Sequence, residues 1–291
     1  MSDPGSDTPR ITSVVVMTSA YAEGKAEAMS AARTVAEGIG CTLTALSPDA
    51  ERFRESGIEV EVCGPGADPP DVCLVLGGDG TILRALRTYA GTGTPVFAVN
   101  FGAIGFLATA ERSDLEGALR RAMSGDFDTL ALPGLALEVA GESMLALNDV
   151  GFSRRPDGPV AALAYSLGGE EVGRVRCDGL VAATPAGSTG YNLANGGPVM
   201  AWGVEGFAVS FIAPHTLTAR ALVVAPSDVL HVKNVGARDS VDVTIDGQKV
   251  HELMSDAEVE VRFRDEVATL AQLPGTTFYG RIREKFGLLA R

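Results

Sequence analysis

The sequence has few cysteines, and none stands at a spacing that would hold a metal. Most lie inside apolar runs and no two form a CxxC pair; they are Cys41, Cys63, Cys73 and Cys177. A metal cluster or a disulfide framework needs closely or regularly spaced cysteines. We therefore expect buried, reduced thiols that serve only packing.

Basic residues are also scarce. The 291-residue chain has 24 Lys and Arg against 37 Asp and Glu, which gives a net charge of −13. Such a charge disfavours general binding to nucleic acid or to anionic membranes. We therefore expect no nucleic-acid partner, and an anionic ligand must be held by local hydrogen-bond donors.

Long apolar runs are missing as well. None approaches the roughly 20 residues that cross a bilayer, and residues 1–10 are polar and rich in Pro, Gly and Asp, unlike a signal peptide. We therefore predict no membrane partner, a cytoplasmic location and a disordered stretch over 1–10. With 46% hydrophobic and 21% charged residues, the remaining chain has the composition of a folded globular protein.

Two common nucleotide-binding patterns, GxxxxGK[ST] and a GxGxxG that opens a helix after a strand, are absent. A different glycine-rich run stands between an apolar stretch over 71–76 and a periodic stretch over 82–87: Gly77-Gly78-Asp79-Gly80-Thr81. This order predicts a buried strand, a tight turn and a helix. Glycine amides and the start of a helix both suit a phosphate group.

Asp79 is the unexpected member of this turn. A carboxylate beside a polyphosphate is repelled unless it accepts a proton from a substrate hydroxyl or helps to hold Mg²⁺. The structural alternative is that Asp79 only caps the following helix. As a base it would contribute roughly 10²- to 10⁴-fold in rate.

The first part of the chain alternates strands with helices, which predicts a parallel α/β sheet that binds ligands at the carboxyl ends of its strands. Asp79 and Asn100 both lie at such ends. The last helix of this part begins with a capping box at Ser113. The expected strands cover 11–18, 41–46, 57–63, 71–76 and 94–100, and the expected helices cover 25–39, 82–87 and 113–123.

The later part alternates apolar residues with other residues, which predicts antiparallel strands in a β-sandwich. A hairpin turn is expected at Gly168-Gly169. We expect strands over 130–132, 135–139, 163–167, 241–245 and 259–263, and helices over 188–195 and 278–288. We predict an α/β domain over 11–128, a mainly-β domain over 129–275, and a C-terminal helix over 276–291 that packs back on the first domain.

Five runs place small or polar residues in apolar surroundings, in the order GGDGT at 77–81, NFGAIGF at 100–106, ND at 148–149, TPAGSTGY at 184–191 and PHTL at 214–217. Together these runs resemble the NAD kinase family over about residues 11–286. GGDGT alone also occurs in lipid and sugar kinases of the same superfamily. The TPxGSTxY run, followed by GGP, is much more specific.

The resemblance implies an enzyme that transfers the γ-phosphate of ATP, or a phosphate of polyphosphate, to the adenosine-ribose 2′-hydroxyl of NAD. It implies Mg²⁺ as cofactor, a homodimer or homotetramer, and a site in the cleft between a Rossmann-like α/β domain and a β-sandwich. It also implies that Asp79 is the catalytic base. The residues expected to bind substrate or nucleotide are Gly77, Gly78, Gly80, Thr81, Arg84, Asn100, Phe106, Asn148, Asp149, Asp178, Thr184, Ser188, Thr189, Gly190, Tyr191, Asp246 and Gln248.

Some positions depart from the family pattern. Asp149 stands where Glu is more common, and Ala186, Gly190 and Ala194 stand where the family often has a larger or hydroxyl side chain. These departures motivate an alternative, a non-catalytic NAD(P)-binding regulator, although Asp79 is retained. A lipid or sugar kinase of the same superfamily is a further alternative, which the TPxGSTxY and PHTL runs disfavour.

Three residue roles stay open at this point. Arg84 either faces phosphate or is a solvated helix residue, and Asp246 either forms a hairpin turn with its neighbours or contributes to the site. Ser188 lacks the GxSxG surroundings of a nucleophile. Binding or helix capping accounts for it better.

Overall fold

The computed structural model describes residues 10–19, 24–64, 66–102, 105–139, 141–237 and 239–287. The predicted disordered stretch over 1–10 lies outside the described residues except for Arg10. The chain divides into two compact units, one of residues 1–131 with 268–291 and one of residues 132–267. The first break follows Ala131, and the chain returns to the first unit at Ala268, earlier than the predicted 276.

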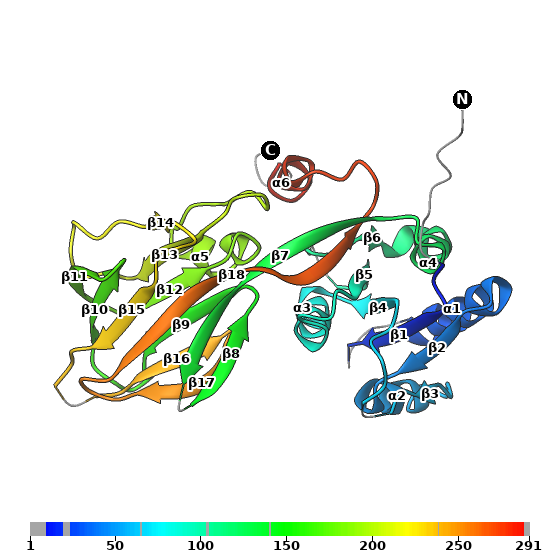
Figure 1. Cartoon of the computed structure of the whole chain (residues 1–291), viewed down its shortest axis with the longest axis horizontal. Coiled ribbons are helices and arrows are strands. Elements are labelled where there is room, and N and C mark those ends of the chain that lie inside the picture. Colours follow the sequence, from blue (N-terminus) through cyan, green and yellow to red (C-terminus); the bar gives the residue numbers. More distant parts are fainter. Residues whose placement is uncertain are drawn as a thin grey trace. The chain divides into compact units, whose positions relative to one another are not determined.

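The first unit is a parallel sheet with helices, as the sequence predicts (Figure 1). Its strands lie in the order β18-β5-β4-β1-β2-β3, with β6 beside β5. The strands are β1 (Ser13–Thr18), β2 (Thr42–Ala45), β3 (Glu61–Val62), β4 (Val72–Gly77), β5 (Pro95–Asn100), β6 (Ala110–Glu111) and the end of β18 (Glu258–Gln272). The helices are α1 (Lys25–Ile39), α2 (Ser47–Arg54), α3 (Asp79–Thr88), α4 (Leu115–Ser124) and α6 (Phe278–Phe286).

The apolar runs of the sequence form the core of this unit. All six residues of β4 are buried, which is why its sequence reads as a continuous apolar run. Alternate β4 residues, such as Leu74, pack with the apolar faces of α1 and α4. Phe97 and Phe127 meet edge to face with their ring centroids 5.7 Å apart. This core fixes the strand ends from which the site loops emerge.

Three local predictions in the chain were wrong in detail. The capping box at Ser113 does not form, because a 3₁₀ turn over Arg112–Asp114 precedes α4 and moves the helix N-cap to Asp114. The strand expected over 57–63 is only the two-residue β3, which is exposed. The helix expected over 188–195 is interrupted at Gly190, whose φ of −99° and ψ of −121° are not helical.

The second unit is the predicted β-sandwich. One antiparallel sheet has the order β14-β13-β12-β9-β16-β17, and the other contains β11-β10-β15-β18 with β7 and β8. Phe152 and Val209 of the first sheet and Leu163 and Val261 of the second belong to one buried apolar cluster. Its strands are β7 (Asp128–Val139), β8 (Glu142–Ala146), β9 (Asp149–Arg154), β10 (Ala161–Leu167), β11 (Glu170–Cys177), β12 (Gly179–Ala183), β13 (Phe207–Ile212), β14 (Leu222–Val224), β15 (Leu230–Asn234), β16 (Val241–Ile245), β17 (Gln248–Leu253) and the first part of β18.

The turns of this unit follow their sequences. Gly168 and Gly169 join β10 to β11 with positive φ angles of 57° and 86°, so the predicted hairpin is confirmed. A 3₁₀ turn (Gly187–Thr189) and the short helix α5 (Tyr191–Ala194) follow β12. Within the described residues, no helix has the length and apolarity needed to cross a membrane.

Candidate active site

The glycine-rich turn lies at the carboxyl end of β4, as predicted. A Cβ added to Gly77 would lie 2.7 Å from Thr81 Oγ1, so the return of the chain into α3 requires glycine there. A Cβ on Gly80, by contrast, would meet no described atom within 4 Å. Gly80 and the first turn of α3 therefore leave open space beside backbone amides, which is where a phosphate could approach.

Asp79 is the first residue of α3, and its carboxylate is turned toward the chain that follows β5. Oδ2 accepts a hydrogen bond from the Phe106 amide at 2.9 Å, and Oδ1 accepts one from the Leu107 amide at 3.3 Å. Within the described chain, no side chain caps α3, whose N-cap is Gly78. The helix-cap interpretation of Asp79 is therefore wrong.

Gly105 allows this approach. A Cβ at Gly105 would lie 2.5 Å from Asp79 Oδ1, a distance that would force one of the two residues to move. The second glycine of the NxGxxGF run, Gly105, is therefore needed because any larger side chain there would collide with the carboxylate of Asp79 in the GGDGT run.

The side chain of Asn100 joins the start of the loop after β5 to later residues by hydrogen bonds. Its Oδ1 accepts from the Gly102 amide at 3.0 Å, and its Nδ2 donates to Glu111 at 3.0 Å. A Cβ added to Gly102 would lie 3.2 Å from the Gly78 Cα. The loops after β4 and β5 are thus in close contact, as expected for neighbouring parallel strands with Gly77 paired to Asn100.

Arg84 has a buried partner that the sequence did not indicate. Its two terminal nitrogens donate to the carboxylate of Asp49 at 2.8 and 2.7 Å, and one also donates to the Thr18 carbonyl at 2.9 Å. Asp49 is fully buried, so the pair satisfies a charge that would otherwise be costly. The structure places Arg84 as a link between α3, α2 and the end of β1.

Phe106 lies in the same unit. Its ring contacts the ring of Phe286 in α6, with the centroids 5.5 Å apart. Its position is therefore set by the C-terminal helix, which lies far away in the sequence.

In the second unit, Asp246 organises the segment that contains the Asn-Asp pair. Its carboxylate accepts from the amides of Leu147, Asn148 and Asp149, at 3.2, 2.7 and 3.1 Å. Asp246 sits in the β16–β17 turn with φ of 47°. Asp246 therefore forms the hairpin turn, as considered from the sequence, and also fixes the backbone at 147–149.

The Asp149 carboxyl is unusual. Its residue is only 6% exposed, and no described residue donates a hydrogen bond to its side chain. Burial, and secondly the negative charge of Asp246, raise its pKa to about 7. Asp149 is therefore a buried acid whose carboxyl has no hydrogen-bond donor among the described residues.

Tyr191 lies close enough to Asp149 and Asp178 for their charges to affect its pKa. Burial raises the pKa of its hydroxyl, and the charges of Asp149 and Asp178 raise it further. Nearly half of Tyr191 remains exposed. The structure thus gathers Asp149, Asp178 and Tyr191 in one region of the second unit.

The hydroxyl-rich turn after β12 is held largely by its own side chains. Thr184 Oγ1 donates to the Leu147 carbonyl at 2.7 Å and accepts from the Gly187 amide at 3.0 Å. Ser188 is fully buried and bonds to Pro185 and Met200. Thr189 donates to the Ala186 carbonyl at 3.3 Å. Thr184 and Ser188 therefore shape the turn, and the exclusion of a serine nucleophile agrees with the burial of Ser188.

Two other positions in this unit have clear surroundings. A Cβ on Gly187 would lie 2.0 Å from the Asn148 carbonyl, so the turn touches the Asn-Asp segment only because this residue is glycine. A Cβ on Gly190 would lie 3.4 Å from the Gly187 carbonyl, an ordinary contact. A methyl group at Gly190 would therefore meet no close contact among the described atoms. Gln248 begins β17 opposite Ile245 and is exposed.

Sequence reasoning missed two arginines. Arg154 donates from Nε to Asp178 Oδ1 at 2.7 Å, and Arg281 of α6 donates to the carbonyls of Phe106, at 3.1 Å, and of Ala108. Each lies far along the chain from the residue that it holds. No local pattern marks either one.

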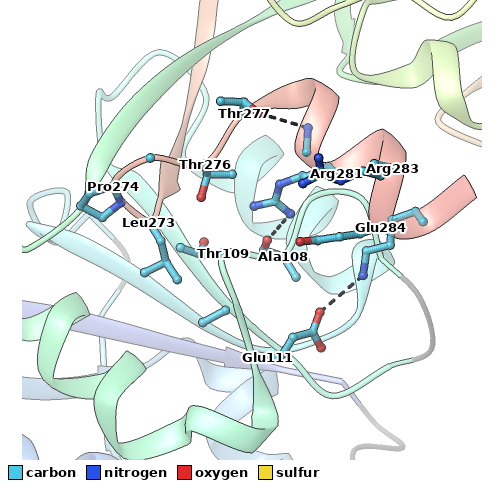
Figure 2. Close-up of a pocket in the computed structure, with 14 residues that line it drawn as sticks. Ala108, Thr109, Glu111, Leu273, Pro274, Thr276, Thr277, Arg281, Arg283 and Glu284 are labelled. Atoms are coloured by element: carbon cyan, nitrogen blue, oxygen red, sulfur yellow. Dashed lines mark hydrogen bonds and ion pairs between the residues drawn. The ribbon is translucent and has the colours of Figure 1, made fainter. Parts of the chain in front are cut away.

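Arg281 forms part of the wall of a cavity of about 450 Å³ in the first unit (Figure 2). Segments 108–111 and 273–277 line it together with α6. Among the residues that the structure describes around this cavity, none was predicted from the sequence as a site residue.

These features define a class of proteins in which a parallel α/β unit with a GGDGT turn accompanies a β-sandwich with a hydroxyl-rich turn. The family model for the ATP-NAD kinase N-terminal domain matches residues 12–127, and that for the C-terminal domain matches residues 147–273. The chain belongs to the ATP-NAD kinase family.

Relatives with known names agree. The NAD kinase of Thermobifida fusca is 34% identical over 283 residues, which cover 91% of this chain and 87% of that protein. The NAD kinase of Symbiobacterium thermophilum is 36% identical over 231 residues, covering 76% and 80%.

Solved structures share the fold. Yeast NADH kinase complexed with NADH has a TM-score of 0.85 at 22% identity and covers 100% of this chain and 94% of its own. An NAD kinase from Archaeoglobus fulgidus in complex with ATP has a TM-score of 0.73 at 24% identity, covering 96% and 99%.

Proposed function

We propose that this chain is an NAD kinase, which transfers the γ-phosphate of ATP to the adenosine-ribose 2′-hydroxyl of NAD. The observation that carries the proposal is the position of Asp79 in a chain that belongs to the ATP-NAD kinase family. Its carboxylate does not cap its own helix but is held by two backbone amides beside the open space at Gly80. A fixed carboxylate beside a phosphate-binding turn suits a base that acts on a hydroxyl.

The reaction needs few groups. The 2′-hydroxyl oxygen attacks the γ-phosphorus as the bond to the β-phosphate oxygen breaks, which leaves ADP, and the hydroxyl proton passes to Asp79. Phosphoryl transfer depends mainly on positioning and on neutralising charge. The amides around Gly78 and Gly80 provide hydrogen bonds to the phosphates in this scheme, while the second unit binds the dinucleotide.

The second unit offers suitable groups for NAD. The Asp149 carboxyl can accept a hydrogen bond from a ribose hydroxyl, because no donor among the described residues uses it and its pKa lies at about 7. Tyr191, which is nearly half exposed, offers an aromatic ring for a base. Asn148 supplies an amide that can donate and accept hydrogen bonds, and Asp178 supplies a carboxylate that accepts them.

Mg²⁺ belongs to the same proposal. We assign the ion to the phosphates of ATP, because Mg²⁺ is usually bound through substrate phosphates and one or two carboxylates rather than by an all-protein cage. Bound there, it would neutralise phosphate charge. A cytoplasmic location and a homodimer or homotetramer complete the proposal, and sedimentation of the purified chain would test the latter.

One assay tests the activity. The purified chain is incubated with ATP, Mg²⁺ and NAD, and NADP is detected with a dehydrogenase that accepts NADP but not NAD. We expect NADP to form in proportion to enzyme, and to disappear when ATP is omitted. Parallel reactions with polyphosphate and with NADH define the donor and the acceptor. Folded protein that forms no NADP with either donor would refute the proposal.

The two alternatives gain no support from the comparisons. The matching family models and the relatives described above carry the name NAD kinase. The residue Asp79, which a non-catalytic regulator would not need, is present and held in place.

A further inference from the structure

One peptide group lies between two charged side chains in the first unit. The amide of Leu107 donates to Asp79 Oδ1 at 3.3 Å, and the carbonyl of Phe106, in the same peptide group, accepts from Arg281 Nη1 at 3.1 Å. Because a peptide group is planar, it cannot rotate about its neighbours without changing both hydrogen bonds. Arg281 therefore acts on the orientation of the amide that holds Asp79.

Arg281 is itself firmly placed. It is 8% exposed, and it also donates to the Ala108 carbonyl and to Gln272 Oε1 at 3.5 Å. The N-cap of the helix that carries it is Thr277, whose hydroxyl accepts from the Gly280 amide at 3.1 Å. Figure 2 shows the Arg281 guanidinium reaching from α6 across the cavity wall to Ala108.

We infer that Arg281 is a positioning residue for the reaction, because it holds the 106–108 backbone whose amides fix the Asp79 carboxylate. The inference rests on the proposed function. It gives the C-terminal helix α6 a part in the chemistry, although α6 lies roughly two hundred residues after the GGDGT turn and contributes no group that contacts substrate.

The geometry of the contact depends on arginine. Nη1 of the planar guanidinium donates to the carbonyls of both Phe106 and Ala108, while Nη2 donates to Gln272 Oε1. A lysine has a single nitrogen on a flexible stem, so it lacks the second nitrogen whose bond to Gln272 fixes the orientation of the first. The positive charge also lies across the peptide from Asp79, and the two charges polarise the intervening hydrogen bonds in the same direction.

The test begins with Arg281→Lys, which keeps the charge. We expect kcat to fall by roughly 10- to 100-fold, because displacement of a catalytic group by about 1 Å can cost that much. The KM values for ATP and NAD should stay within about threefold, since the contacts that bind both substrates are unchanged. Arg283→Lys, an exposed position on the same helix, is the matched control and should leave kcat unchanged.

A double-mutant cycle separates positioning from a structural role. If Arg281 acts through Asp79, Arg281→Lys should have almost no further effect on kcat in an Asp79→Asn background, because residues that act as a unit are not additive. The same fold-loss in both backgrounds would overturn the inference. Wild-type kcat in Arg281→Lys would also overturn it.

Amide hydrogen exchange provides a readout that needs no activity. The peptide that contains Leu107 should exchange faster in Arg281→Lys than in the wild type and in Arg283→Lys. Failure of the proposed function would show as wild-type protein that makes no NADP, whereas failure of this inference would show as unchanged exchange at Leu107. The two results are therefore distinguishable.

Discussion

Replacement of Asp149 by asparagine should remove a pH dependence from the stability of the second unit. The carboxyl is 6% exposed, receives no hydrogen bond from the described residues, and has a pKa raised by burial and by Asp246 to about 7. Asparagine has nearly the same shape but does not titrate. The variant therefore tests the buried acid without enlarging or emptying its site.

The Asp149 carboxyl makes the unfolding free energy depend on pH, because proton binding is linked to folding. The folded state binds this proton more tightly than the unfolded state, in which the pKa is near 3.8. The stability that the carboxyl contributes is present below pH 3.8 and is lost as the pH rises through about 7. The difference between the two pKa values corresponds to about 4 kcal/mol, at about 1.4 kcal/mol per tenfold change in the protonation equilibrium.

Urea unfolding measures this effect in the correct unit, because the single tryptophan of the chain, Trp202, lies in the second unit. Its fluorescence is followed for the wild type, for Asp149→Asn and for the exposed control Asp157→Asn. The unfolding free energy of Asp149→Asn, relative to that of the wild type, should rise by about 4 kcal/mol from about pH 4 to about pH 8. The unfolding free energy of Asp157→Asn should follow that of the wild type at each pH. A gain that does not change with pH would refute the reasoning.

Two further substitutions test residues of the first unit. Arg84→Gln should lower the unfolding free energy by about 1.5–3 kcal/mol in urea denaturation, because the buried carboxylate of Asp49 loses charged donors. A raised KM for ATP at unchanged stability would instead favour a contact between Arg84 and phosphate. Gly105→Ala should lower kcat by roughly 100-fold in steady-state assays, because its Cβ would displace the Asp79 carboxylate. The control Gly38→Ala, whose Cβ would meet no described atom within 4 Å, should keep the wild-type kcat.

Much of the fold could be predicted from local patterns. The apolar run before Gly77 is a fully buried strand, and the alternating residues of the later segments form the sandwich. The glycine pair at 168–169 turns a hairpin with positive φ angles. Each of these features depends on residues that are neighbours in the sequence, so periodicity and turn chemistry were sufficient.

The misses concern contacts between distant parts of the chain. Arg84 pairs with Asp49, and Arg281 bonds to Phe106 across 175 positions. Nothing in the residues that flank either arginine distinguishes a buried partner from solvent. The capping box at Ser113 failed for a different reason, because a 3₁₀ turn preceded the helix and moved its N-cap to Asp114.

The candidate site shows the same division. The sequence identified Asp79 and Asn100 as strand-end residues, and the structure pairs the ends of β4 and β5. It did not identify what holds Asp79, because those donors are backbone amides of Phe106 and Leu107, which carry no side-chain signature. The same is true of Asp246, whose three partners are amides.

The most direct test of the account is the turnover of Asp79→Asn with ATP, Mg²⁺ and NAD. Asparagine keeps one acceptor oxygen for the amides of Phe106 and Leu107 but cannot take up the hydroxyl proton. We expect kcat to fall by roughly 10²- to 10⁴-fold, with the KM for NAD little changed. A variant that makes NADP at close to the wild-type rate would contradict the assignment of Asp79 as the base.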